Sequence, residues 1–412
     1  MIWFYLISGL FLGWSLGAND AANIFGTAVG SRMIKFRTAA IVSAVFVVLG
    51  AVISGAGATQ TLGKLGAVNA IAGSFTVALS AAVTVTWMTK LKMPVSTSQA
   101  IVGAIIGWNF FTGSPTDINS LIKIVATWVL CPLLAAAFAF VFYKITMPVL
   151  TRTKIHLLEQ DSYNRVGLLL VGAFGAYSLG ANNIANVMGV FVPANPFNDL
   201  SLGSLFTLSG TQQLFLLGAI AISVGVFTYS YKVMMTVGND LLKLTPIAAL
   251  IVVLSESIVL FLFASKGIET WLASHGLPTI PLVPVSSSHA VIGGIVGIVL
   301  AKKGRGINIK VLGKISSGWI TTPIIAAIIS FIALYFAQNV FEQKVVTPGR
   351  ETKVEIQEID TKNEIIRKEN SDEIIFNENI DDENHSKSNT ESTTESDQKN
   401  KDKIERDENS IY

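Results

Sequence analysis

The sequence has little charge and almost no cysteine. Only 14% of its 412 residues are Asp, Glu, Lys or Arg, against roughly a quarter in soluble domains, and 51% are apolar. This deficit of charge argues against a soluble enzyme and against a nucleic-acid-binding protein, which would need a basic surface. The single cysteine, Cys131, lies in an apolar run and excludes a framework of disulfides within the chain.

The small net charge of +2 conceals two unlike parts. Residues 1–341 contain 19 Lys and Arg against 8 Asp and Glu, a net charge of +11, whereas residues 342–412 contain 11 against 20, a net charge of −9. The second part is rich in Ser, Thr, Asn and Glu, a composition that cannot bury enough apolar surface to fold. We predict a membrane domain followed by a polar, disordered C-terminal tail over 342–412, with partner binding as the alternative role of the tail.

Long apolar runs dominate the first part. A helix needs about 20 apolar residues to cross the hydrocarbon core. Eight runs approach or meet that length: 2–30, 38–58, 70–89, 121–143, 166–191, 214–231, 247–264 and 315–336. Two shorter runs, 94–111 and 284–301, begin with a polar cluster. The first run lacks a basic n-region and contains Asp20, so it is not a cleaved signal peptide.

The positions of Lys and Arg predict the orientation. If all ten segments cross and the N-terminus is outside, most of the basic residues fall in inside loops, and loop 192–211, which has none, is outside. If the two short segments returned to the side from which they came, the basic loop 152–165 would move outside. We therefore predict a multi-pass protein of the cell membrane with both termini outside.

The chain matches itself in three places. Ser15-Leu-Gly-Ala-Asn-Asp-Ala-Ala-Asn23 matches Ser178-Leu-Gly-Ala-Asn-Asn-Ile-Ala-Asn186, and Pro94-Val-Ser-Thr-Ser-Gln-Ala100 matches Pro284-Val-Ser-Ser-Ser-His-Ala290. A third match relates Trp128 and Pro132 to Trp319 and Pro323. Three matches in the same order define an internal repeat.

Each repeat contains five segments, so the second is upside down relative to the first. Inverted repeats are typical of secondary transporters, whose site lies between the halves near the midplane. The sequence thus predicts an all-α integral membrane protein of two inverted-topology repeats of five segments each, with broken helices at the centre. Repeat 1 covers 1–143, a cytoplasmic linker covers 144–165, and repeat 2 covers 166–341.

The first repeated motif predicts a cation site. On a helix, Asn19, Asp20 and Asn23 share a broad face, and an acid inside the membrane indicates a functional site. Their oxygens suit Na⁺, while the carboxylate alone would suit a proton; the alternative is that the amides only join helices. The second copy supplies Asn182, Asn183 and Asn186. Glu256 is the other acid well inside a predicted span, with ion binding and a neutral structural role both open.

The second repeated motif predicts an anion site. Pro followed by Ser or Thr starts and caps helices, and the apolar stretch that follows is too short to cross as one helix. Two half-helices would then begin at membrane depth, with their free N–H groups and hydroxyls facing an oxyanion. The residues concerned are Ser96, Thr97, Ser98 and Gln99 in one half and Ser286, Ser287, Ser288 and His289 in the other. The alternative is ordinary capping of short buried helices.

The two motifs, with Gly26-Thr-Ala-Val-Gly30 after the first, resemble the paired signatures of the inorganic phosphate transporter (PiT) family over about the first 340 residues. The resemblance implies a symporter of inorganic phosphate coupled to Na⁺ or H⁺, with a central site and no cofactor beyond the coupling ion. By position, the six Asn and Asp residues would line the cation and substrate sites, with Asn23 and Asn186 also on the anion beside the Ser and Thr hydroxyls. Membrane lipid and a second copy of the chain, forming a homodimer, are further partners, and nucleic acid is not one.

The sequence departs from the family pattern at two positions. Asn183 stands where the second signature usually has Asp, and Val47 aligns where many members have an acid. Since some members resembling this family transport sulfate, a sulfate or proton symporter is the alternative function, and an anion channel or sensor is a third. Phosphate at neutral pH donates a hydrogen bond and sulfate does not, so a carboxylate facing the anion would favour phosphate.

Overall fold

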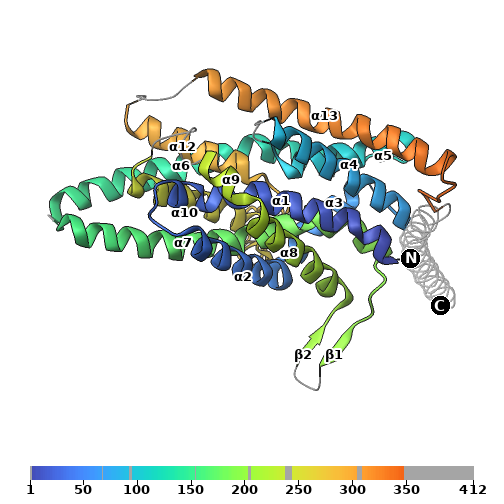
Figure 1. Cartoon of the computed structure of the whole chain (residues 1–412), viewed down its shortest axis with the longest axis horizontal. Helices are drawn as coiled ribbons and strands as arrows, with labels where there is room; N and C mark the ends of the chain where they lie inside the picture. The colour runs from blue at the N-terminus through green and yellow to red at the C-terminus, as the bar shows by residue number, and fades with distance from the viewer. Residues whose placement is uncertain are drawn as a thin grey trace, which may run out of the picture. The chain divides into compact units, whose positions relative to one another are not determined.

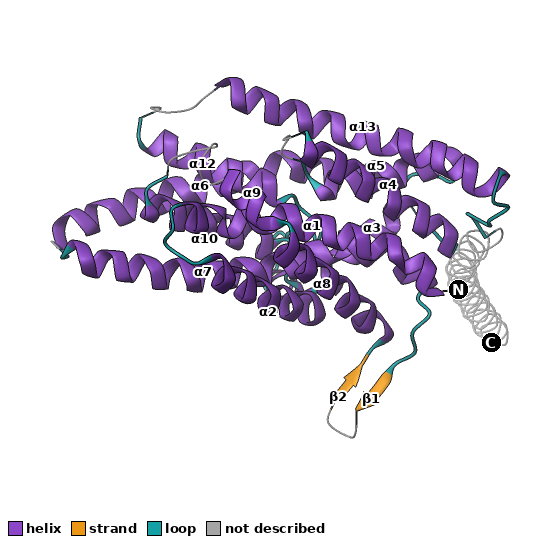
Figure 2. Cartoon of the chain, viewed as in Figure 1, coloured by secondary structure: helices purple, strands orange, loops and turns teal. Residues whose placement is uncertain are grey.

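The computed structural model describes residues 2–66, 68–91, 95–153, 155–202, 206–236, 244–303 and 309–347. Its elements (Figures 1 and 2) are α1 (Ile2–Gly30), α2 (Phe36–Ser54), α3 (Ala56–Leu65), α4 (Ile71–Lys90), α5 (Thr97–Thr112), α6 (Ile118–Thr153), α7 (Leu157–Met188), the 3₁₀ helix η1 (Gly189–Ala194), β1 (Leu200–Leu202), β2 (Phe206–Leu208), α8 (Gly210–Thr228), α9 (Ser230–Thr236), α10 (Pro246–Leu262), α11 (Lys266–Ser274), α12 (Ser287–Ala301) and α13 (Ile309–Asn339). The two strands pair antiparallel, with Leu200 opposite Leu208, and project from the helices.

The predicted helical membrane fold is confirmed. Among the described residues, seven helices are long and apolar enough to cross a membrane, and eight if α10 and α11, bent by 66°, count as one span. The short helices α5 and α12 begin at Thr97 and Ser287, where the polar clusters predict half-helices.

Several features differ from the predicted segments. The short helices α3 and α11 and the β-hairpin were not predicted, because none of them has an apolar run of membrane length. Most of the predicted linker 144–165 is helical: α6 continues to Thr153 and α7 begins at Leu157. At 1.5 Å per residue the 36-residue α6 is about 54 Å long, so it extends past the roughly 30 Å hydrocarbon core. Figure 1 shows the joined ends of α6 and α7 as one end of the bundle.

The predicted tail begins with residues that pack on the bundle. Val345 is buried, and its carbonyl accepts a hydrogen bond of 3.0 Å from the Trp108 indole of α5. Asn69 and Thr347 pair through Asn69 Nδ2 to the Thr347 carbonyl at 3.1 Å and Thr347 N to Asn69 Oδ1 at 2.9 Å. The remainder of the predicted tail, 348–412, lies outside the described residues.

Helices of one half pack on helices of the other through small residues, as is common in membrane proteins. A Cβ added at Gly17 of α1 would overlap the Ile222 carbonyl of α8, and one added at Gly180 of α7 would overlap the Val47 carbonyl of α2. The pairs α5–α13 and α12–α6 repeat this pattern: Gly103 lies against Pro323, and Gly293 lies against Pro132. Each contact thus has a counterpart in which the halves are exchanged. The opposite membrane orientation of the halves stays a prediction.

Gly17→Ala is expected to destabilise the protein, because the new methyl group overlaps backbone rather than a flexible side chain. Overpacking of this kind costs about 1–3 kcal/mol, which a thermal unfolding curve in detergent would register as a lower Tm. The matched control is Gly63→Ala in α3, where an added Cβ meets nothing within 4 Å. That control should be neutral or slightly stabilising, since Ala favours helix over Gly. Equal Tm values for the two variants would contradict the close α1–α8 contact.

Two helix pairs position the central residues. α4 runs beside the first half of α1, as shown by the stacked rings of Phe4 and Phe75, 5.4 Å apart, and by the 2.9 Å contact between the Ser15 and Thr86 hydroxyls. α4 therefore ends beside the middle of α1, and α5 returns along it until Trp108 meets Gly73. The sequence predicted one crossing for each of these two segments; α4 is long and apolar enough to cross, and the sides of the membrane on which the termini lie stay a prediction.

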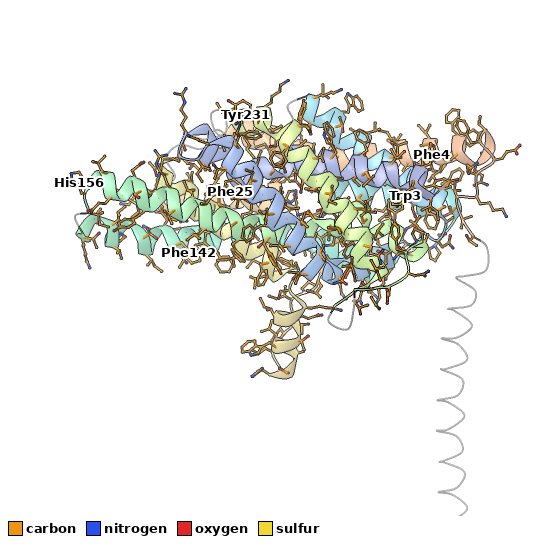
Figure 3. The ribbon with its side chains drawn as sticks, turned by 60° about the horizontal axis from the view of Figure 1, so that its bottom comes forward. Trp3, Phe4, Phe25, Phe142, His156 and Tyr231 are labelled. Atoms are coloured by element: carbon orange, nitrogen blue, oxygen red, sulfur yellow. The ribbon has the colours of Figure 1, made fainter. Side chains whose placement is uncertain are left out.

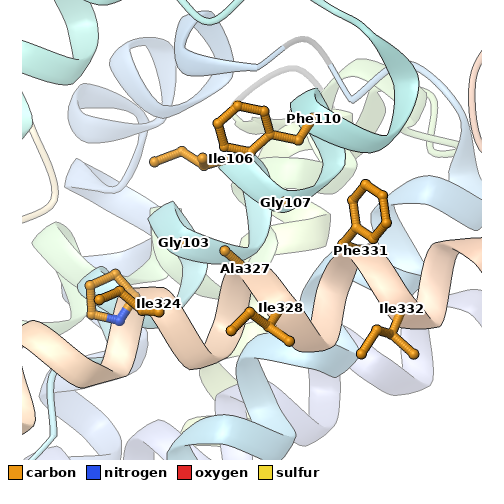
Figure 4. A pocket seen from close by; sticks show the side chains of 10 residues that line it. Gly103, Ile106, Gly107, Phe110, Ile324, Ala327, Ile328, Phe331 and Ile332 are labelled. Carbon is orange, nitrogen blue, oxygen red and sulfur yellow. The ribbon is translucent and has the colours of Figure 1, made fainter.

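The outer face of α5 and α13 forms a groove of about 560 Å³ (Figure 4). Apolar side chains line it, among them Ile106, Phe110, Ile328 and Phe331. A surface of this composition suits lipid chains and contains none of the predicted site residues.

Candidate functional site

The α1 motif is buried in the bundle. Asp20 is 2% exposed, and Asn19 and Asn23 are each 8% exposed. Phe25, which follows this motif on α1 and is labelled in Figure 3, is completely buried. Asn19 Nδ2 donates a 2.8 Å hydrogen bond to Asp20 Oδ1. The α1 motif therefore presents a single buried carboxylate to the centre of the molecule.

Both half-helices reach this carboxylate. The hydroxyls of Thr97 at the start of α5 and Ser287 at the start of α12 lie beside Asp20. Thr97 Oγ1 lies outside hydrogen-bond geometry with this carboxylate and has no partner among the described residues. Since Thr97 and Ser287 are equivalent positions of the repeat, Asp20 lies where the two halves meet.

In the second copy of the motif, both polar atoms of Asn182 have hydrogen-bond partners, whereas Asn183 and Asn186 each keep one polar atom without a partner among the described residues. Asn182 Nδ2 donates to the Val283 carbonyl at 3.1 Å, and Asn182 Oδ1 accepts from Val285 N at 2.8 Å, so this side chain positions the segment before α12. Asn186 Nδ2 donates to Asn183 Oδ1 at 2.8 Å. The buried Asn183 Nδ2 and Asn186 Oδ1 atoms have no partner among the described residues. They remain free to bind a ligand.

The first serine of each cluster is a helix cap. Ser96 Oγ accepts from Gln99 N, and Ser286 Oγ accepts from His289 N, each at 3.3 Å. The first intrahelical bonds of α5 and α12 end on the carbonyls of these same caps. The N–H groups of the next two residues in each helix therefore have no intrahelical acceptor and face the centre as donors.

The third residue of each cluster, Ser98 or Ser288, connects the halves. Ser98 Oγ donates to the Val285 carbonyl at 3.1 Å, and Ser288 Oγ donates to the Val95 carbonyl at 2.9 Å. Asn186 Nδ2 donates to Ser98 Oγ at 2.8 Å. In the other half, Asn23 Nδ2 reaches Ser288 Oγ at 3.3 Å and Ser287 Oγ at 2.9 Å. The exchange of halves seen in the helix packing thus extends to the side chains of the site.

Gln99 and His289 are both buried, and the His289 side chain contacts α6 and α13. His289 Nδ1 is 3.0 Å from the Trp128 carbonyl of α6, and its ring lies 3.8 Å from the ring of Trp319 of α13. Within the described residues, the His289 side chain makes no hydrogen bond to Asn19, Asp20 or Asn23, and its Nε2 atom has no partner. Gln99 Oε1 has no partner among the described residues. Anion binding by these two side chains stays a prediction.

The chemistry of this cluster fits a hard cation beside an oxyanion. Asp20 supplies a carboxylate, the Asn and Ser side chains supply neutral oxygens, and the Val95 carbonyl lies 3.4 Å from Asn19 Nδ2. Oxygen ligands of this kind suit small hard cations. The helix starts, Thr97 Oγ1 and Asn183 Nδ2 supply donors for an anion. None of the contacts described for this cluster involves Lys or Arg.

The structure adds groups that the predicted site residues do not include. The carbonyls of Val95 and Val285 accept the connecting serine bonds, and only the Pro that precedes each Val signals an extended segment at these places. Cys131 Sγ of α6 lies 3.6 Å from the Ser286 carbonyl and so supports the start of α12. Glu256, whose role the sequence left open, is completely buried in α10.

Comparisons with known proteins agree with the geometry. The model of the phosphate transporter family matches residues 16–159, 153–270 and 275–396. A protein of Methanocaldococcus jannaschii named as a phosphate permease is 28% identical, over 79% of this chain and 95% of its own. The sulfate permease CysP of Bacillus subtilis is 29% identical, over 79% of this chain and 85% of its own. A solved structure titled "The sodium-dependent phosphate transporter" has the same fold, with a TM-score of 0.65, 24% identity, and coverage of 82% of this chain and 99% of its own.

Proposed function

Since the chain belongs to the phosphate transporter family, we propose that it is a secondary active transporter that imports inorganic phosphate by symport with Na⁺. The observation that supports this function most is the position of Asp20, which lies beside the hydroxyls of Thr97 and Ser287 at the start of both half-helices. A cation ligand and an anion site are adjacent there.

This adjacency gives a physical basis for coupling. A phosphate oxyanion entering beside an ionised Asp20 would be repelled by about 4 kcal/mol at 4 Å and an effective dielectric constant near 20. Na⁺ on Asp20, with the oxygens of Asn19 and Asn23, would neutralise that carboxylate and turn repulsion into attraction. Each ion therefore binds better when the other is present, which is the requirement for symport.

The connecting serines suggest how the halves separate. Ser98 and Ser288 donate their hydroxyl hydrogens across the centre to backbone carbonyls. We infer that an oxyanion takes over these donors, so that binding the anion releases one half from the other. If the halves are inverted repeats, exchange of their conformations exposes the site on alternate sides of the membrane.

Asp20 also bears on the choice of anion. Phosphate keeps at least one proton at neutral pH and can donate it to a carboxylate or to an amide oxygen such as the buried Asn186 Oδ1, which has no partner within the described part of the chain. Sulfate has no proton to donate and would leave these acceptors unsatisfied, a cost of about 1–3 kcal/mol per group.

Proteoliposome transport of radiolabelled phosphate tests the proposal. We expect an inward Na⁺ gradient to drive accumulation, K⁺ in place of Na⁺ to abolish it, and excess sulfate to compete weakly. Accumulation driven equally by a proton gradient without Na⁺ would assign the coupling to H⁺. No accumulation under either gradient would exclude phosphate symport.

Sulfate transport is the second candidate, favoured by the sulfate permease relative and by Asn183 in place of a second carboxylate. A site with fewer carboxylates more readily accepts sulfate, an anion that has no proton to donate. In the same liposomes, sulfate accumulation that phosphate fails to inhibit would establish this alternative.

A further inference from the structure

Glu256 of α10 is an acid buried without a partner. Its exposed fraction is 0%, and neither carboxylate oxygen has a hydrogen-bond partner among the described residues. An isolated ionised carboxylate is very costly in an apolar interior, and an acid at membrane depth indicates a functional role. The coupling site proposed above does not use it.

The groups that face Glu256 contain no cation. Asp20 of α1 lies within electrostatic range, as does the Cys131 thiol of α6. His289 is the titratable residue of α12, and it already pairs with the Trp128 carbonyl. On α7, Tyr177 lies beside Phe261, and the Arg165 guanidinium bonds to Met33 O and Asp161 instead. Among the described residues, Glu256 has no hydrogen bond and no ion pair with a Lys or Arg.

The surroundings of the two buried acids differ, and this difference indicates that Asp20 and Glu256 bind different ligands. Asp20 is beside an amide and two hydroxyls, so a metal ion there would find further oxygen ligands. Glu256 has no hydrogen-bond partner among the described residues: the neighbouring hydroxyls of Ser255 and Ser257 donate to carbonyls of their own helix, Ile251 and Val253. A hard cation needs several oxygens, whereas a proton needs only the carboxylate.

The repeat places the two acids in opposite halves. Val252-Val-Leu-Ser-Glu-Ser-Ile258 of α10 aligns with Val77-Ala-Leu-Ser-Ala-Ala-Val83 of α4, so that Glu256 corresponds to Ala81. Asp20 of the first half corresponds to Asn183 of the second. Each half therefore contributes one of these two buried acids. The two acids lie at different positions of the repeat, so neither carboxylate has a counterpart in the other half.

We propose that Glu256 is a proton-binding site that is separate from the Asp20 cation site and protonated whenever the anion is bound. The inference rests on the proposed anion transport. A proton from the water on the side where the site opens binds a Glu256 carboxylate oxygen, removing a negative charge that would oppose the anion. The proton leaves to water on the opposite side after the anion has gone, so one proton moves with each anion.

Calorimetry of phosphate binding tests this directly. At about pH 8.5, in two buffers with different ionisation enthalpies, the wild-type protein should take up about one proton more per phosphate bound than Glu256→Gln. Phosphate itself takes up the same number of protons in both proteins. The difference in proton uptake between wild type and Glu256→Gln is therefore due to Glu256. Glu159→Gln, at an exposed acid of α7, is the matched control and should behave as wild type. Equal proton numbers for wild type and Glu256→Gln would overturn the proposal.

A second measurement does not need transport or phosphate binding. Ionising Glu256 in an apolar core costs free energy, so the wild-type Tm in detergent should fall as the pH rises from about 6 to 9. Glu256→Gln cannot ionise there and should lose this part of the pH dependence, while Glu159→Gln keeps it. Parallel curves for wild type and Glu256→Gln would refute the proton site. Absence of phosphate binding together with diverging curves would refute the proposed function alone.

Discussion

Asp20→Asn is expected to abolish Na⁺-dependent phosphate uptake in proteoliposomes. The variant keeps the shape of the side chain and replaces the only carboxylate of the site by a neutral amide. Asn19 Nδ2, which donates to Asp20 Oδ1 at 2.8 Å, can still donate to an amide oxygen, so the fold should persist. What disappears is the negative charge that binds the cation, and a charge-assisted contact of this kind contributes about 1.5–3 kcal/mol. Na⁺ affinity should therefore fall by about tenfold or more.

The Asp20→Asn experiment has a clear control. Glu269→Gln removes a charge from the exposed helix α11, which has no buried residues, and should leave the Na⁺ dependence of uptake intact. The two variants are compared by uptake against Na⁺ concentration and by Tm in detergent. A normal Tm with absent Na⁺-driven uptake supports Asp20 as the cation ligand. Unchanged Na⁺ dependence in Asp20→Asn would remove this residue from the site.

The positions of the buried polar residues could be predicted because the sequence repeats them. Asn19 and Asn23 recur as Asn182 and Asn186, and a pattern of amides within apolar segments has few explanations other than a site between two halves. The starts of α5 and α12 followed from Pro and Ser at the beginning of runs too short to cross. In the second motif, local chemistry was enough to predict where each helix begins.

The features that the sequence did not reveal depend on depth and on tertiary contacts. Hydropathy measures the apolar length of α4 but not that this helix runs beside the first half of α1. The difference between Ser96, which caps α5, and Ser98, which reaches the Val285 carbonyl, depends on the orientation of α5 relative to α12. Similarly, only the packing of α10 reveals that Glu256 has no partner.

In each cluster the first serine caps a helix and the last serine reaches the other half. These different roles lead to a prediction that separates phosphate binding from the stability of the protein. Ser98 and Ser288 present hydroxyls to the centre, so Ser98→Ala and Ser288→Ala should each weaken phosphate binding by about tenfold, the effect of one hydrogen bond to a charged ligand. Ser96 and Ser286 cap their helices, so Ser96→Ala and Ser286→Ala should each cost about 1 kcal/mol of stability. Calorimetric Kd values and Tm values of the four variants provide the comparison.

The four variants also test whether the halves act alike. The bonds of Ser98 and Ser288 differ by only 0.2 Å, at 3.1 and 2.9 Å, and the caps accept at the same 3.3 Å, so the two variants of each kind should have similar effects. Large Kd changes confined to α12 would show that the anion binds one half-helix only. Cap variants that weaken phosphate binding as much as Ser98→Ala, at unchanged Tm, would make the caps direct ligands.

The double variant Ser98→Ala with Ser288→Ala tests whether the connecting serines bind the anion from both sides. If they do, the loss of phosphate affinity should be at least the product of the two single losses, because an oxyanion held from both halves loses both contacts at once.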